Sequence, residues 1–222
     1  GAHGNGFDRV SAFQDGYEGG AAECAAYQNH PPAVTEAAYT SYQDQASGGN
    51  LGLGDMLSTV TKSLQTYWAR QASGTKTTSA PTVVAASNAP ACRGGTDGGV
   101  LDDTVTYCPS TNTITYDAKT LQHAHDGIGD FASGALVAAA WSSSVQHQTG
   151  HTLGTAAARK GAECLAGAWA ANSSTSLSPG DLDEAVTLLV AGNHESTNRG
   201  SAFERVAAFR AGYKNGPSRC LE

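Results

Sequence analysis

A segment near the start of the chain recurs at its end, and this internal repeat constrains the fold most. Residues 7–24 read FDRVSAFQDGYEGGAAEC and residues 203–220 read FERVAAFRAGYKNGPSRC, with nine of eighteen positions identical and no gap. In both copies, apolar side chains recur at helical spacing before a glycine, which predicts an amphipathic helix and its stop. The alternative is a chance amphipathic match, which identities that include a cysteine oppose.

The two copies indicate how the chain is divided. A unit of this length is too short for a solenoid repeat, so we expect each copy to be the C-terminal helix of a domain. Residues 1–27 would then hold the end of a preceding, similar domain, followed by a linker over residues 28–50 that is rich in Gln, Ala, Ser and Gly. Residues 51–222 would form one domain of ordinary size.

Hydrophobic periodicity between the copies changes from helix spacing to strand spacing and back. A further helix is expected to end near residue 192, with Ser178 as its cap, Pro179 in its first turn and Asp181 near the positive end of its dipole. The pattern predicts an α+β fold, mainly helical with a small sheet. We expect strands over 81–86, 104–107 and 113–116, the last two in a hairpin, and helices over 54–71, 130–146, 155–171 and 201–213.

The composition excludes some classes of function. The net charge is −7 and only 15% of residues are charged, with no basic stripe, so we expect no nucleic-acid partner. The longest apolar stretch, residues 134–141, is far shorter than the ~20 residues of a membrane span. Any membrane connection would therefore lie in a segment outside this sequence.

The five cysteines have no metal-type spacing. Cys92 and Cys108 flank a glycine-rich turn before a predicted strand, which favours a disulfide, and the alternative is a pair of buried free thiols. Cys164 and Cys220 are the second expected pair, which leaves Cys24 over. Because disulfides persist in oxidising compartments, we expect an extracytoplasmic protein, secreted or the ectodomain of a membrane-anchored envelope protein.

The run from Gly129 to Gln146 reads GDFASGALVAAAWSSSVQ, and five other segments accompany it in a fixed order along the chain. Together these six segments resemble the bacterial neutral zinc metallopeptidases, in which the equivalent run goes from GDFA to VQ and contains the HExxH helix. The resemblance covers about residues 50–220 and implies a zincin-like fold. The other segments resemble its YW, YCP…IYLD, ADCFAGxWA, PGDIEEA and closing QRVxWFxxGY sequences, and they lie at residues 67–68, 107–117, 162–170, 178–185 and 203–220.

The resemblance implies that the zinc-binding residues are missing. A zincin needs two histidines one helical turn apart, a glutamate base beside the first, and a third ligand on the next helix. Gap-free alignment puts the two histidine positions at Ala139 and Ser143, and the position of the base at Ala140. The third ligand falls on Arg159, a fixed positive charge where Zn²⁺ would lie. We therefore expect a catalytically inactive relative with no metal cofactor.

A histidine pair that follows this run offers an alternative metal site. The segment from His147 to His151 reads HQTGH, so the two histidines would be ligands and Gln148 would replace the base. Glutamine cannot accept the proton that a general base must take. The glycines at 150 and 154 also indicate that the helix is ending there. An active hydrolase using this pair is the alternative function.

Other clusters of polar residues are weaker candidates. The run from His123 to Asp126 could hold a metal in a loop, and residues 142–144 are three serines without an identifiable histidine and aspartate. The acids Asp181, Asp183 and Glu184 are better explained by the start of a helix than by acid–base catalysis.

We expect a scaffold or regulator that binds an envelope protein or a peptide segment. A structural spacer in a repeated array is a third reading.

Overall fold

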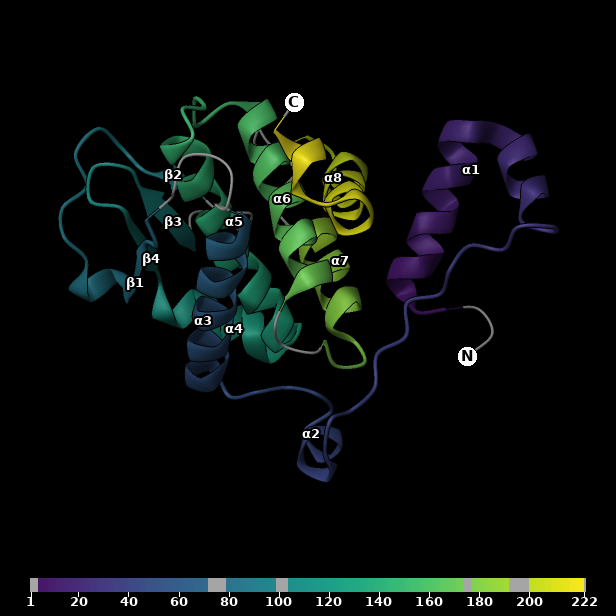
Figure 1. Cartoon of the computed structure of the whole chain (residues 1–222). Coiled ribbons are helices and arrows are strands. Elements are labelled where there is room, and N and C mark those ends of the chain that lie inside the picture. The colour runs from purple at the N-terminus through teal and green to yellow at the C-terminus, as the bar shows by residue number, and fades with distance from the viewer. Residues whose placement is uncertain (1–3, 72–78, 99–103, 174–176, 192–199, 222) are drawn as a thin grey trace.

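The computed structural model describes residues 4–71, 79–98, 104–173, 177–191 and 200–221. This part of the chain is mainly helical with one small sheet, which confirms the α+β class (Figure 1). No helix of the described residues has both the length and the apolar character needed to cross a bilayer. The α-helices are α1 (Gly6–Ala26), α2 (Tyr42–Ala46), α3 (Leu53–Gln71), α4 (Ala118–Gly127), α5 (Asp130–Gln148), α6 (Ala156–Asn172), α7 (Asp181–Ala191) and α8 (Ala202–Asn215).

The sheet lies against one side of the helical core. Its strands are in the order β1-β4-β3-β2, with β1 parallel to β4 and the other pairs antiparallel. In the expected hairpin between β3 and β4, Cys108 pairs with Thr113, and Asn112 adopts a left-handed φ of 48° in the turn. Helix α5 packs against β3. The strands are β1 (Thr82–Ala85), β2 (Asp97–Gly98), β3 (Val105–Cys108) and β4 (Thr113–Tyr116).

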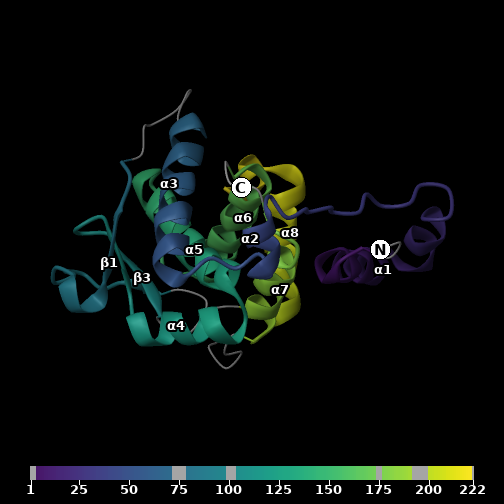
Figure 2. The ribbon, with the colours of Figure 1, turned by 90° about the horizontal axis from the view of Figure 1, so that it is seen from below.

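Helix α5 is the centre of the core (Figures 1 and 2). Every residue from Asp130 to Gln146 is buried, as expected for a helix that is apolar or small on all sides. Helices α3, α4, α6 and α7 pack around it. The ring of Phe131 stacks on that of Trp169 in α6, with centroids 5.8 Å apart. The Trp169 indole N–H donates to the Ser63 hydroxyl at 3.1 Å, so its polar atom is satisfied inside the core.

Two helices in the structure are absent from the sequence-based prediction. Helix α4 begins where the Asp117 carboxylate accepts the Thr120 N–H at 2.7 Å, an N-cap followed by ten residues of amphipathic helix that sequence inspection missed. Helix α2 is a short turn within the predicted linker, capped by Ser41.

The start of α7 also differs from the prediction. The helix begins at Asp181, so Pro179 lies in the turn before the helix and not in its first turn. The Ser178 hydroxyl donates to Asp44 of α2 at 3.2 Å, while the Ser178 N–H donates to the Asp181 carboxylate at 2.7 Å. Ser178 therefore ties the linker to the domain instead of capping the helix.

Residues 4–51 form what we call the N-terminal arm. Helix α1 lies beside α7 and α8, and an extended linker returns from it to the start of α3 (Figures 1 and 2). The linker ends at Asp130 of α5, whose carboxylate accepts the Leu51 N–H at 2.8 Å and whose N–H donates to Asn50 at 2.8 Å. The Leu51 backbone and the Asn50 side chain thus fix the end of the arm to the first turn of the core helix.

Candidate functional site

The positions that the resemblance assigns to zinc chemistry lie on two packed helices. Ala139, Ala140 and Ser143 are on α5 and are 5%, 2% and 4% exposed. Arg159 is in the first turn of α6, half-buried, with its Nε enclosed by protein. Helices α5 and α6 are in direct contact. Alanine has no donor atom for a metal, and a guanidinium stays protonated in proteins, so this set of side chains cannot hold Zn²⁺.

The alternative histidine pair does not share one helix. Helix α5 ends at Gln148, and Gly150 in the following turn has a φ of 95°. His151 therefore lies beyond the helix, where its Nδ1 is 3.0 Å from the hydroxyl of Thr149. His147 is exposed, and its ring lies 6.1 Å from that of Tyr107. The two rings are not presented one turn apart on a helical face, which is the geometry that an HExxH site requires.

The segment from His123 to Asp126 lies on α4, so the prediction that it is a loop is wrong. His125 joins the domain to the arm, because its Nε2 is 2.7 Å from the Leu51 carbonyl and its Nδ1 is 3.0 Å from Asp126. Burial alone would lower the pKa of His125, but these two hydrogen bonds raise it. His125 is thus engaged by the backbone of the linker.

The three serines of α5 lie inside the core. The Ser142 hydroxyl donates to the Ala138 carbonyl at 2.8 Å, and the Ser144 hydroxyl donates to Asn112 at 2.9 Å. Serine hydroxyls that bond to the carbonyl one turn earlier are common in helices and need no catalytic explanation.

An acidic cluster formed by Asp130, Asp181 and Glu184 joins two helix starts. One carboxyl oxygen from each of the three residues lies within 4.8 Å of the other two. Among the described residues, this cluster is the group whose side chains are close enough together to hold a metal ion. Glu184 accepts the Phe131 N–H at 2.9 Å, so α7 supplies a hydrogen-bond acceptor to the N-terminal end of α5. A Cβ atom on Gly129 would lie 2.0 Å from Glu184 Oε1, and Gly129 has a φ of 147°, so only glycine fits there.

The environment of this cluster favours its neutral forms. Burial, with the nearby charges, raises the pKa of both Asp181 and Glu184 to about 7, and burial also raises the pKa of Asp130. Each carboxylate accepts a backbone N–H, so each has a structural role at a helix start or linker. The sequence analysis found the acids of α7 but not their meeting with Asp130, because the two segments are about fifty residues apart.

Both expected disulfides are present. Cys92 bonds Cys108 across a sequence separation of 16, and Cys164 of α6 bonds Cys220 after α8 across a separation of 56. Cys24 is free and exposed. Two disulfides in a chain of this size are typical of an oxidising, extracytoplasmic compartment.

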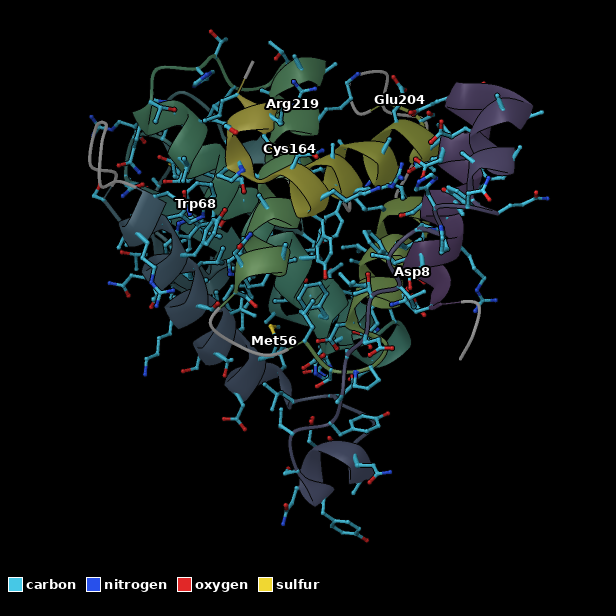
Figure 3. The ribbon with its side chains drawn as sticks, turned by 45° about the vertical axis from the view of Figure 1, so that its right-hand side comes forward. Asp8, Met56, Trp68, Cys164, Glu204 and Arg219 are labelled. Carbon is cyan, nitrogen blue, oxygen red and sulfur yellow. A yellow bond between two sulfur atoms is a disulfide. The ribbon has the colours of Figure 1, made fainter. Side chains whose placement is uncertain are left out.

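Two cavities lie under the arm. One, of about 820 Å³, lies between linker residues 34–40 and the described residues 170–173 and 177–182 at the end of α6 and the start of α7. A second, of about 240 Å³, lies where the linker crosses the core; Met56, which borders it, is labelled in Figure 3. The arm also holds most of the large apolar side chains that are exposed in the described residues, namely Phe13, Tyr17, Val34, Tyr39, Tyr42 and Leu51.

No protein-family model, curated protein or solved structure matches this chain. The fold and the disulfides define a mainly helical α+β domain of the extracytoplasmic type.

Proposed function

We propose that the chain is a non-hydrolytic relative of the neutral zinc metallopeptidases that acts outside the cytoplasm by binding an envelope protein or a peptide segment. The observation that carries this proposal is the set of residues at the four zinc-site positions. Ala139, Ala140 and Ser143 on α5 and Arg159 on α6 supply neither three ligands nor a general base.

The positions of the six resembling segments support the proposal. They fall on α3, the β3–β4 hairpin, α5, α6, α7 and α8, so each matches a structural element or its start. The GDF sequence that begins at Gly129 has a specific physical reason, since the glycine makes room for the Glu184 carboxylate. Small side chains at Ala139, Ala140 and Ser143 let α5 remain buried without a metal.

The surface of the arm supports a binding role. Six large apolar side chains are exposed on it, with exposed fractions from 39% for Tyr39 to 80% for Tyr42. Phe13 and Tyr17 stack on each other with ring centroids 6.4 Å apart, so part of this exposed apolar surface is contiguous, as at interaction sites. The chain carries a net charge of −7, so this surface does not suit a nucleic-acid partner.

The proposal is tested by rebuilding the zinc site. The variant Ala139→His, Ala140→Glu, Ser143→His, Arg159→Glu should bind about one zinc per chain, because structural zinc contributes about 10–16 kcal/mol and crowding costs about 1–3 kcal/mol per larger core side chain. Wild-type protein should bind none. Zinc is measured by elemental analysis after dialysis against buffered Zn²⁺, and circular dichroism checks the fold.

The control variant tests the alternative site. Gln148→Glu completes an H-E-x-x-H sequence from His147 to His151, and we expect no stoichiometric zinc because α5 ends at Gln148. If wild-type protein holds one zinc that is lost on changing His147 to Ala, the binding-only function is wrong. If the rebuilt variant folds but binds no zinc, the resemblance to the metallopeptidases is wrong.

A further inference from the structure

The sequence repeat is also a repeat of local structure. Helix α1 starts with a capping box between Asn5 and Asp8, and α8 starts with one between Ser201 and Glu204, at equivalent positions. In each box the side chain of the cap accepts the third N–H, and the acid accepts the N–H of the cap. Asp8 and Glu204 are labelled in Figure 3, where each lies in the first turn of its own helix.

Both helices break at the equivalent glycine. Gly20 interrupts α1 with φ 70° and ψ −165°, and Gly216 ends α8 with φ 79° and ψ −178°. One further helical turn follows each glycine and carries the repeated cysteine, Cys24 or Cys220. The two segments therefore share a cap, a helix, a break and a cysteine turn.

The two helices pack on each other through equivalent residues. Phe7 meets Tyr213 with ring centroids 5.1 Å apart, and the equivalent pair, Phe203 and Tyr17, meets at 4.9 Å. A second pair of equivalent contacts has similar spacings, 6.3 Å for Phe7 with Phe209 and 6.1 Å for Phe203 with Phe13. Reciprocal contacts of this kind are the signature of a two-fold arrangement. Helices α1 and α8 are thus equivalent members of a reciprocal pair, in which the two helices cross at a steep angle (Figures 1 and 2).

Helix α8 has a second face, which docks on α6 at backbone contact. A Cβ atom on Gly212 would lie 1.7 Å from the Cys164 carbonyl oxygen, and one on Gly167 would lie 2.0 Å from the Phe209 carbonyl oxygen. The two helices can approach this closely only because a glycine lies on each side. Phe209, beside this contact, is 2% exposed.

An ion pair and a disulfide complete this contact. Arg205 of α8 is fully buried and donates from Nε to Glu163 of α6 at 2.9 Å. Cys220 bonds Cys164, the residue after Glu163; Cys164 is labelled in Figure 3. Helix α6 therefore offers the sequence Glu-Cys-x-x-Gly-Ala, in which each named residue either contacts α8 or permits its approach.

No helix among the described residues packs on the equivalent face of α1. Phe13 and Tyr17 are 64% and 72% exposed, and Arg9 is exposed and bonds only to the backbone of its own helix start. A Cβ atom on Gly16 would meet nothing within 4 Å except the Cys24 sulfur, at 2.7 Å. The free thiol therefore lies beside the glycine, at the place where α8 receives α6 and its cysteine.

We propose that this open face of α1, formed by Arg9, Phe13, Gly16, Tyr17 and Cys24, is the docking surface for a helix of the α6 type from a second domain of the same architecture. The docking helix carries a glutamate for Arg9, a glycine for the close approach at Gly16, and a cysteine that bonds Cys24. The two thiols lose two protons and two electrons to a disulfide oxidant, which is reduced to two thiols. The inference rests on the binding role proposed above but not on the loss of zinc.

The proposed docking helix resembles α6 of this chain, so a peptide of residues 155–172 can replace it in an experiment. A synthetic peptide of this sequence carries an aromatic thiol on the Cys164 sulfur as a mixed disulfide. The Cys24 thiolate attacks the peptide sulfur, and the aromatic thiolate leaves with the bonding electrons. The release of this thiolate gives the rate, and mass spectrometry of a digest identifies the modified cysteine. Each rate is divided by the rate with the small aromatic disulfide alone, which corrects for exposure of Cys24.

Matched controls separate docking from simple thiol reactivity. The peptide with Gly167→Leu is expected to react about tenfold more slowly, because its leucine prevents close approach although it favours helix. Protein with Gly16→Leu should show the same loss, and Glu18→Leu, on the opposite side of α1, should show none. Equal normalised rates for the two peptides would overturn the proposal. So would rapid formation of Cys24–Cys24 dimers that outcompetes the peptide, since the face would then serve a second copy. Neither result bears on the zinc experiment.

Discussion

Helices α1 and α8 have closely similar sequences but very different surroundings. Both are set by the same caps and the same glycine break, so local sequence is sufficient to specify their shape. Phe209 of α8 is nevertheless 2% exposed, whereas Phe13, its equivalent in α1, is 64% exposed. The difference arises from α6, which covers only one of the two helices. The same residues are thus core in one copy and surface in the other.

The largest difference between the copies should come from removing these equivalent rings. Phe209→Ala is expected to cost about 4 kcal/mol in the free energy of unfolding, since it empties a packed core site. Phe13→Ala should cost less than about 0.5 kcal/mol, as for most surface changes. Urea unfolding followed by circular dichroism measures both. Equal losses would mean that the face of α1 is covered in solution and that the comparison fails.

A smaller and opposite pair of effects is expected from the glycines. In Gly212→Ala the added methyl collides with the Cys164 carbonyl, so α6 and α8 must separate, at a cost of about 2 kcal/mol. In Gly16→Ala the only neighbour is the flexible Cys24 side chain, and the better helix former should add about 0.5–1 kcal/mol. Thermal unfolding of the two variants should move in opposite directions. A loss in both would place a helix against α1 already in the isolated chain.

The sequence predicted those features that depend on neighbouring residues. The helix and strand positions around α3, α5, α6 and the β3–β4 hairpin follow from periodicity, and the end of α5 before His151 follows from Gly150. Helix α4 was missed because its cap at Asp117 lies directly after a strand, where no apolar run announces a helix. Single-sequence patterns do not report such joins reliably.

Features that depend on distant residues could not be predicted. Glu184 and Asp130 come from separate motifs, and only the packing of α7 on α5 brings their oxygens together. The proposal that Ala139 and Ser143 stand where zinc ligands would be rests on the resemblance alone, so it uses no tertiary information. The sequence also does not predict that α6 covers α8 but leaves α1 uncovered. The reason is that the two helices differ little in sequence on the faces concerned.

The smallest expected effect is a pH dependence, and it concerns how each copy of the repeat is attached to the rest of the domain. Helix α8 is held by a disulfide, whereas the linker of the arm is held at Asp130 and His125, beside Asp181 and Glu184. The pKa of both Asp181 and Glu184 is raised to about 7, so their stabilising contribution is complete below their ordinary pKa and is lost as the pH rises through about 7. The raised pKa of His125 acts in the same direction.

Raising the pH from about 5 to about 8 should therefore lower the melting temperature. The linker should loosen at a lower pH than α8 does. Hydrogen exchange, corrected for the intrinsic effect of pH, should show lost protection over residues 40–51 and retained protection in α8. The double variant Asp181→Asn, Glu184→Gln should flatten this dependence, because it removes the charges that develop. Equal loosening of α8 and the linker would show that the acidic cluster supports the whole core and not the attachment of the arm. In that case α1 and α8 would differ in whether a helix packs on their outer face, but their attachments would respond to pH in the same way.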